Sequence, residues 1–346
     1  MSTVVSVARR SFPLPPERNA SVPPEARGLA RDEVRMLVAR DAIVHARFRE
    51  LPRQLRAGDL VVVNNSAVMT AAVDAVMGEL PVTVHFSTWL DDGRWVVEIR
   101  SAERTRFPDA DLAPGAELVL PDGARVVLDE PWLPPARRLW TARTDADPRA
   151  TMTAHGRPIT YAYVRQRWSA DYYTTVFGRL PGSAEMPSAA RPFTDRLVLD
   201  LLTSGVAVAP VTLHTGVSSP ETGEPPSPER FAVPAATARQ VNATRAAGGR
   251  VVAVGTTVTR ALESAADPTG SVRPASGWTD LVLGVDRPAR AVDGLITGWH
   301  APGASHLDLL VAVAGPDIVD ESYAAALDTG YLWHEFGDSA LLMRGA

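Results

Sequence analysis

Several apolar runs in this sequence end in small polar residues of the kind that bind ligands. Residues 251–254 (VVAV) lead into residues 255–257 (Gly-Thr-Thr), and the helical segment that follows carries Arg260 and Glu263. A buried strand that turns into a helix in this way leaves outward-pointing N–H groups, which bind anions and hydroxyls. The alternative is an ordinary helix cap, with Arg260 and Glu263 as an ion pair on the helix surface.

Three further runs end in the same manner. Asn64, Asn65 and Ser66 follow residues 60–63, Thr212, His214 and Gly216 close residues 206–213, and Thr297, Trp299 and His300 follow residues 295–296. In an α/β sheet, ligands bind at the carboxyl ends of the strands. We therefore expect the four ends to form one cluster, although each end alone is typical of turn chemistry.

Two kinds of region must position these residues. From about residue 68 to residue 143 the chain has short, strand-like segments of alternating pattern, separated by Asp-Gly turns. This arrangement is typical of an antiparallel β domain. The remaining sequence alternates strand-like and helix-like segments, as α/β domains do. We therefore predict a main α/β domain from residues 1–66 and 151–346, with a small β domain from residues 67–150 inserted in it.

The composition excludes several kinds of chemistry. The chain has 346 residues, no cysteine, and 35 basic residues that are all arginine. Without cysteine it has no thiol nucleophile, disulfide or cysteine-ligated metal. The seven histidines are scattered, and His300 and His306 lack the i,i+4 spacing of helical ligands, so we expect no metal. The net charge of −5 gives no overall attraction to nucleic acid.

The sequence contains no stretch of the roughly 18 apolar residues that a membrane span needs. Residues 11–16 (SFPLPP) stand where a secretion signal would be apolar, so we expect a cytoplasmic protein without a membrane partner. Residues 218–228 (SSPETGEPPSP) are rich in Pro, Gly, Ser and Glu, which predicts a mobile surface loop. The sequence does not indicate an oligomeric state.

A series of motifs, in order along the chain, resembles the S-adenosylmethionine:tRNA ribosyltransferase-isomerase family. The matching segments, between about Gly58 and Leu342, are LVVVNNSAV, DYYTTVFGRLPGSAEMPSAARPFT, VTLHTG, GTTVTRALES, GWTDLVLGVDRPARAVDGLITGWHAPGASHLDLLVAVAG and FGDSALL. The resemblance implies an α/β fold, with a barrel-like main domain and an inserted small antiparallel β-barrel domain.

The family resemblance also implies a reaction. Family members transfer the ribosyl part of S-adenosylmethionine to an aminomethyl-deazaguanine base in tRNA, convert the sugar to an epoxycyclopentane, and release adenine and methionine. In the usual account, a base removes the acidic proton at C5′, beside the sulfonium. S-adenosylmethionine is thus a substrate, and no metal or redox cofactor is required.

The strand ends and the resemblance together assign residue roles. The residues expected to contact S-adenosylmethionine are Asn64, Asn65, Ser66, Thr212, Gly255, Thr256, Thr257 and Arg260. The partner of Arg260 is either a ligand carboxylate or an acid of the protein such as Glu263. Proton transfer is assigned to His214, Glu229 or His300, and the sequence does not choose among the three.

The chain also departs from the family pattern. Pro192 replaces a usual histidine, Ala67 replaces a basic residue, and residues 216–220 and 226–229 replace two motifs, of which Glu229 is kept. Proline cannot transfer a proton, and alanine cannot pair with a phosphate. We therefore expect an enzyme that cleaves or rearranges S-adenosylmethionine on a small-molecule or otherwise non-standard acceptor, with tRNA doubted. The alternatives are the ordinary tRNA enzyme of queuosine biosynthesis and a non-catalytic, nucleoside-binding paralogue.

Overall fold

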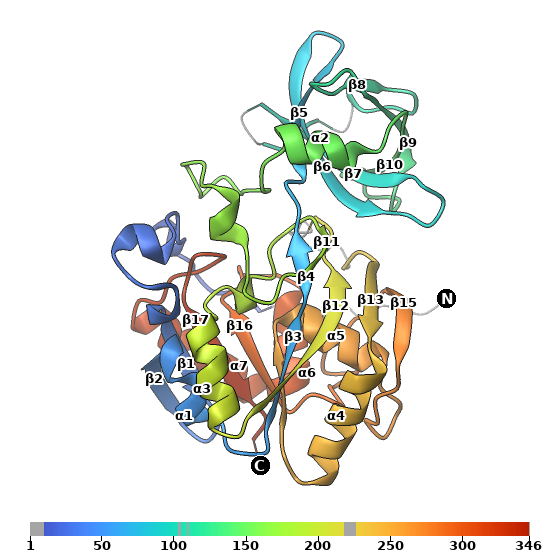
Figure 1. Ribbon diagram of the computed structural model, residues 1–346. Helices are drawn as coiled ribbons and strands as arrows, with labels where there is room; N and C mark the ends of the chain where they lie inside the picture. The colour runs from blue at the N-terminus through green and yellow to red at the C-terminus, as the bar shows by residue number, and fades with distance from the viewer. Residues whose placement is uncertain (1–9, 103–104, 109–110, 218–225, 346) are drawn as a thin grey trace.

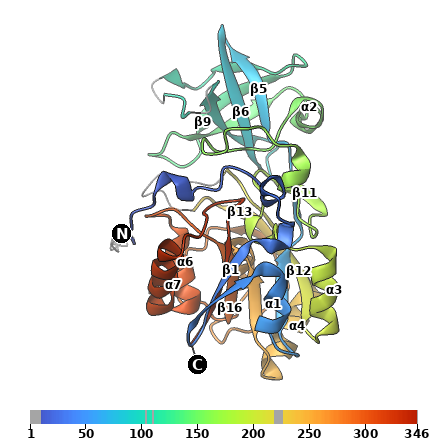
Figure 2. The same ribbon diagram turned by 90° about the vertical axis from the view of Figure 1, so that its left-hand side faces the viewer.

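The computed structural model describes residues 10–102, 105–108, 111–217 and 226–345. Figure 1 shows a closed barrel of strands above a larger body in which helices cover a sheet, and the view turned by 90° (Figure 2) separates the same two parts. A short parallel sheet of β4 (Ser66–Val68) and β11 (Leu180–Ser183) lies between them.

The large sheet has nine strands. Their order is β15 (Ala275–Thr279), β13 (Glu229–Val233), β12 (Ala207–His214), β3 (Leu60–Asn64), β14 (Val251–Val254), β16 (Gly294–Gly298), β17 (Ser339–Met343), β1 (Arg35–Ala39) and β2 (Ile43–Arg47). The central strands β12, β3, β14 and β16 are parallel to their neighbours in this group, so their carboxyl ends share one edge of the sheet. In Figure 1 this edge faces the barrel.

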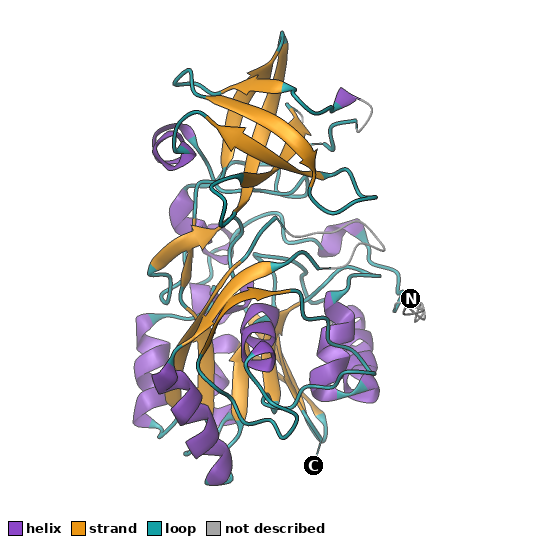
Figure 3. Cartoon of the chain, turned by 90° about the vertical axis from the view of Figure 1, so that its right-hand side faces the viewer, coloured by secondary structure: helices purple, strands orange, loops and turns teal. Residues whose placement is uncertain are grey.

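The helices lie on both faces of this sheet, as Figure 3 shows. The α-helices are α1 (Leu51–Gln54), α2 (Pro148–His155), α3 (Asp195–Thr203), α4 (Ala235–Ala246), α5 (Thr256–Ser264), α6 (His306–Ala314) and α7 (Pro316–Asp328). Short 3₁₀ turns occupy Pro16–Arg18, Pro24–Arg27, Arg31–Glu33, Phe48–Glu50, Ala170–Tyr173 and Ser188–Ala190. Among these elements only α2 belongs with the barrel, where Met152 is buried in the barrel core.

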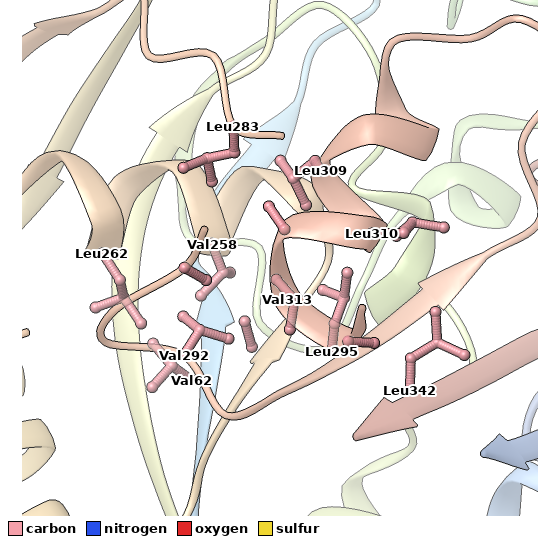
Figure 4. Packing of buried hydrophobic residues seen from close by; sticks show 14 of the residues in the cluster. Val62, Val258, Leu262, Leu283, Val292, Leu295, Leu309, Leu310, Val313 and Leu342 are labelled. Carbon is pink, nitrogen blue, oxygen red and sulfur yellow. The ribbon is translucent and has the colours of Figure 1, made fainter. Parts of the chain in front are cut away.

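Burial on both faces explains the continuous apolar runs of the central strands. Alternate residues of β14 point to opposite cores: Val251 and Ala253 pack with α5 and α6, and Val252 and Val254 pack on the side of α3. Figure 4 shows the first core, with Val62 of β3 close to Val258 of α5. Each buried valine contributes roughly 1.5–3 kcal/mol relative to exposure, so a polar residue within these strands would be costly.

The barrel is closed by six antiparallel strands. Their order around the barrel is β10 (Leu139–Thr144), β7 (Trp95–Ser101), β6 (Leu80–Trp89), β5 (Ala72–Met77), β8 (Glu117–Val119) and β9 (Arg125–Pro131). The predicted Asp-Gly turns at 92–93 and 122–123 connect β6 to β7 and β8 to β9. Closure leaves the barrel without the exposed edges of an open sheet.

The predicted fold class, α/β with an inserted antiparallel β-barrel, is confirmed. The main sheet has two edge strands, β15 and β2, rather than closing on itself. The barrel strands lie between Ala72 and Thr144, and the chain division at residues 66–67 and 150–151 stays a prediction. Most of the predicted loop at 218–228 lies outside the described residues.

Three side chains near the β6–β7 turn join the barrel to the main sheet. Asp91 in that turn accepts a hydrogen bond from the Trp278 indole of β15 (2.8 Å) and pairs with Arg230 of β13 (2.5 Å). Nearby, the backbone N–H of Val217 donates to the Ser87 hydroxyl at 2.8 Å. These contacts hold the barrel against the end of the sheet where the polar strand ends lie.

No helix in the described ranges combines the length and the apolar character that a bilayer crossing requires.

A buried carboxylate stabilises the barrel. Glu98 of β7 is 1% exposed and bonds to His85 (3.1 Å), Arg100 (2.6 Å) and Arg138 (3.0 Å). Burial opposes the charge of Glu98, but the hydrogen bond from His85 and the nearby cations outweigh it and lower its pKa to about 2. The negative charge is therefore part of the folded barrel.

We predict that Glu98→Gln lowers the free energy of unfolding by about 3 kcal/mol at pH 7, because it removes the buried negative charge to which His85, Arg100 and Arg138 are bonded. Below pH 4.5 the unfolded carboxylate takes up protons first, so the stabilisation by Glu98 is lost as the pH falls toward about 2 and the variant approaches the wild type. Denaturant titrations measure both effects. The control Glu130→Gln removes an exposed carboxylate 3.5 Å from Arg94 and should cost about 0.5 kcal/mol or less; equal losses would contradict the prediction.

Candidate active site

A cavity of about 600 Å³ lies at the carboxyl ends of β14 and β16. Its walls come from the segments 159–163, 185–189, 215–217, 226–229, 255–260, 281–283, 297–309 and 334–335 and from Tyr173, with Arg138 contributed by the barrel. The two parts of the molecule thus meet at one cavity, and its volume is that of a typical small-molecule site.

The turn between β14 and α5 forms one wall of the cavity. Gly255 has a φ of +91°, which favours glycine, and its N–H donates to the Ile296 carbonyl at 2.8 Å. The turn aims the first residues of α5, Thr256 and Thr257, at the cavity. The Thr257 hydroxyl oxygen is buried and has no hydrogen-bond partner among the described residues, and the same holds for the indole nitrogen of Trp299. Both residues line the cavity, so a ligand that reaches these buried atoms can supply the missing partner.

Arg260, one turn further along α5, is engaged by the protein itself. It forms an ion pair with Glu229 of β13 and donates to the carbonyls of Leu281 (3.2 Å) and Thr279 (3.1 Å). The second carboxylate oxygen of Glu229 accepts the Gly216 N–H at 3.3 Å. Burial raises the pKa of Glu229, and the charge of Arg260 and this N–H act in the opposite direction.

The proposed surface pair between Arg260 and Glu263 is not formed. Glu263 is 2% exposed and accepts the N–H groups of Arg290 (2.8 Å) and Ala291 (2.7 Å). Its ion partner is Arg287 at 3.4 Å. Glu263 therefore fastens the segment before β16 to α5, and the acid that pairs with Arg260 is Glu229.

Three histidines of the cavity wall are neutral at ordinary pH. The rings of His300 and His306 stack at 4.5 Å with 4° between their planes, and His334 lies in the same wall. Burial lowers the pKa of all three: to about 4 for His306, where Arg260 adds to the effect, to about 4 for His334, and well below the usual value for His300. Neutral imidazoles can accept protons.

Two phenol–carboxylate pairs lie in the wall next to His334, whose ring stacks on Tyr163 at 4.4 Å. The Tyr161 hydroxyl donates to Glu185, and the Tyr163 hydroxyl donates to Glu335. Tyr161 stacks on Tyr163 (5.8 Å between centroids, 18°). Burial raises the pKa of Glu335, which Tyr163 partly offsets, and burial also raises the pKa of Tyr163 well above its usual value.

The structure brings together about half of the predicted site residues. Those in the cavity wall are Glu229, His300, Gly255, Thr256, Thr257 and Arg260. The other five, Asn64, Asn65, Ser66, Thr212 and His214, are not among the lining residues.

These five residues bond to one another and to the backbone. The Asn64 amide donates to the Leu213 carbonyl at 2.8 Å and so ties β3 to β12. The Thr212 hydroxyl donates to the side-chain amide oxygen (Oδ1) of Asn65 at 2.7 Å. Ser66 is hydrogen-bonded to Nδ1 of His214 at 2.8 Å, and burial followed by the charge of Arg230 lowers the pKa of that imidazole. Their arrangement satisfies buried polar groups within the protein.

Sequence reasoning missed the other half of the wall. The missed titratable residues are Tyr161, Tyr163, Glu185, His306, His334 and Glu335. Most of them lie in irregular segments without apolar periodicity, so no strand end points to them. The sequence pointed to only one of these residues: His306 lies close to His300 in the chain.

The described residues contain no group of three or more His, Asp or Glu side chains arranged to hold a metal ion. The expectation that no metal is required stays a prediction.

Known proteins resemble this chain over nearly its whole length. The family model described as queuosine biosynthesis protein matches residues 7–342. S-adenosylmethionine:tRNA ribosyltransferase-isomerases of Gluconacetobacter diazotrophicus and Sphingopyxis alaskensis are 35% and 34% identical, each over 96% of this chain and 95% of their own length. The crystal structure of the S-adenosylmethionine tRNA ribosyltransferase of Thermotoga maritima aligns with a TM-score of 0.54 and 28% identity, covering 96% of this chain and 99% of that one.

The fold, the titratable cavity and these similarities define an enzyme of the transferase and isomerase class. Within that class, the chain belongs to the queuosine biosynthesis protein family.

The expectation of a small-molecule acceptor, with tRNA doubted, is wrong, because the full-length relatives are named for tRNA. That expectation depended largely on Ala67 and Pro192. Neither residue lines the cavity: Ala67 lies in β4 against Gly178, and Pro192 is buried beside Arg191, whose guanidinium pairs with Glu25 at 2.8 Å. The two substitutions therefore change packing outside the cavity wall.

We predict that the neutral His306 makes the fold sensitive to acid. The unfolded histidine protonates near pH 6.5 and the folded one only near pH 4, so the free energy of unfolding falls through this window by on the order of 3 kcal/mol. Denaturant titrations at pH 7 and pH 4 should show a smaller loss for His306→Asn than for the wild type. The exposed control His155→Asn should lose as much as the wild type; equal losses in all three proteins would refute the assignment.

Proposed function

We propose that this protein is an S-adenosylmethionine:tRNA ribosyltransferase-isomerase, which moves the ribosyl part of S-adenosylmethionine to a base in tRNA and rearranges it. The observation that carries the proposal is one cavity, in a chain of this family, that combines unpartnered donors with neutral proton acceptors. On this proposal the protein acts in the cytoplasm, where its tRNA substrate is.

The α5 wall is suited to the donor substrate. The positive end of a helix dipole and the free Thr257 hydroxyl favour a negatively charged or hydroxyl-bearing group. The methionine carboxylate of S-adenosylmethionine is such a group. Arg260 is already paired with Glu229, so in this proposal it positions the wall and does not bind the carboxylate directly.

Among the three predicted proton acceptors, the geometry favours His300. His214 bonds to Ser66 away from the cavity wall, and Glu229 is held in an ion pair. His300 Nε2 lies 3.1 Å from the Thr297 hydroxyl, which itself donates to the Gly298 carbonyl at 3.2 Å. We therefore assign the ring proton to Nε2, which leaves Nδ1 as the acceptor.

In the proposed first step, His300 Nδ1 accepts the proton from C5′ of S-adenosylmethionine. The electron pair of that C–H bond stays on carbon, where the adjacent sulfonium stabilises it. The imidazole becomes cationic, and the low pKa caused by burial and by His306 and His334 makes it ready to return the proton later in the reaction. The cavity walls limit the access of water during these steps.

The test is adenine release from S-adenosylmethionine in the presence of tRNA that carries the aminomethyl-deazaguanine base. We expect turnover by the wild type, with the sugar appearing on the tRNA, and a 10²–10⁴-fold lower kcat for His300→Asn with KM for S-adenosylmethionine within about threefold. The control His155→Asn should behave as the wild type. If the wild type transfers nothing to tRNA, the proposed function is wrong; if His300→Asn keeps full activity, only the choice of base is wrong.

We further predict that Thr257→Val weakens S-adenosylmethionine binding about tenfold, because it removes one hydrogen bond to the ligand. Since the hydroxyl has no protein partner among the described residues, the melting temperature should stay the same or rise. Calorimetry and thermal melts measure the two effects. The exposed control Thr153→Val, on α2, should leave the affinity unchanged. Unchanged affinity in Thr257→Val would remove this contact from the proposal.

A further inference from the structure

Glu335 is a part-buried carboxylate in the cavity wall without a cationic partner. One of its oxygens accepts the Tyr163 hydroxyl, and no arginine or histidine of the described residues forms an ion pair with it. Charged groups removed from water are normally paired. The other glutamate that lines this space near α5, Glu229, follows that rule through Arg260.

The cations near the cavity are committed elsewhere. Arg260 is bound to Glu229, and Arg138 of the barrel donates to Glu98 at 3.0 Å. The three imidazoles of the wall are neutral at ordinary pH. The protein therefore brings a negative group to this end of the cavity and leaves its charge to be balanced by something else.

Aromatic rings lie next to the carboxylate. Tyr161 (5.8 Å, 18°) and His334 (4.4 Å, 16°) both stack on Tyr163, and the Tyr163 hydroxyl, at the edge of this column of rings, donates to Glu335. Glu335 also follows His334 directly in the chain. Tyrosine rings attract cations, most strongly where water is excluded. A carboxylate at the edge of such a column is a favourable site for an organic cation, whose charge is spread over or shielded by carbon.

We propose that Glu335 and the column of Tyr161, Tyr163 and His334 form a subsite for a cationic group of the bound substrate, either a sulfonium or a primary ammonium. This inference rests on the proposed function, whose substrates carry both. S-adenosylmethionine has a sulfonium and the ammonium of its methionine part, and an aminomethyl base brings an ammonium of its own. Each of these three cationic groups would place one positive charge against Glu335 and carbon atoms against the rings.

The variant Glu335→Gln tests the subsite, because glutamine has the same shape, still accepts the Tyr163 hydroxyl, and lacks the charge. Three ligands are titrated calorimetrically into the wild type and the variant: S-adenosylmethionine, S-adenosylhomocysteine, which has the ammonium but no sulfonium, and 5′-methylthioadenosine, which has neither. The KM for tRNA carrying the aminomethyl base is measured in parallel. The control Glu321→Gln removes an exposed carboxylate of α7, and thermal melts check that all variants are folded.

We expect Glu335→Gln to weaken at least one of the interactions that involve a cation tenfold or more and to leave the affinity for 5′-methylthioadenosine within twofold of the wild type; an equal loss for 5′-methylthioadenosine would overturn the subsite. A loss for S-adenosylmethionine alone identifies the sulfonium, and a loss for both S-adenosylmethionine and S-adenosylhomocysteine identifies the methionine ammonium. A loss in the KM for tRNA alone identifies the acceptor ammonium. All four values within twofold of the wild type would overturn the subsite, and so would an equal loss in Glu321→Gln.

A second variant separates charge from local structure. Glu335→Asp keeps the negative charge on a shorter side chain, so it should lose less affinity than Glu335→Gln does. If Glu335→Asp weakens binding as much as Glu335→Gln does, the effect is structural and the cation subsite is wrong. A wild type that binds no S-adenosylmethionine and releases no adenine overturns the proposed function itself, and the subsite with it.

Discussion

The burial of β3, β14 and β16 on both faces is the constraint on which the site depends. These strands have helices on either side, so a polar side chain within them would be left without water or a partner. Polar residues are therefore confined to the strand ends, and the parallel direction of the strands brings those ends to one edge. The cavity lies at this edge because it is the one place where the sheet can present functional groups.

The barrel completes the cavity from the other side. Its β6–β7 turn is held against β13 and β15 through Asp91, and Ser87 accepts a hydrogen bond from the backbone next to Gly216. Gly216 in turn donates to Glu229, the partner of Arg260. A continuous series of polar contacts thus connects the barrel to the first turns of α5. The position of the barrel therefore affects the position of α5.

Much of the fold could be predicted from local sequence patterns. Residues 251–254 form β14 as expected, and the helical segment expected after them is α5, because apolar runs and helical periodicity depend on near neighbours. The pairing of Arg260 with Glu229 could not be predicted, since it joins residues 31 positions apart across the folded sheet.

Contacts between residues far apart in the sequence also limited the prediction of the candidate site. A residue that follows an apolar run, such as Thr257, could be placed from the sequence, whereas Glu335 and Tyr163 meet only through the tertiary fold. The opposite error occurred with Asn64 and His214, which stand at strand ends but use their polar atoms to join β3, β4 and β12. A strand end supplies polar groups, and only the folded structure decides whether they bond inward to the protein or outward to a ligand.

The cavity draws its wall from segments that belong to separate hydrophobic cores, one inside the barrel and two against the main sheet. The two cores of the main sheet share its strands, whereas the barrel has a core of its own, so the barrel and the main sheet are natural cooperative units, each with its own free energy of opening. An intact cavity requires both units at once, since Arg138 and the Ser87 contact come from the barrel and α5 from the main sheet. The temperature at which activity disappears is accordingly set by the weakest unit, and much of the helix and strand content can survive beyond it.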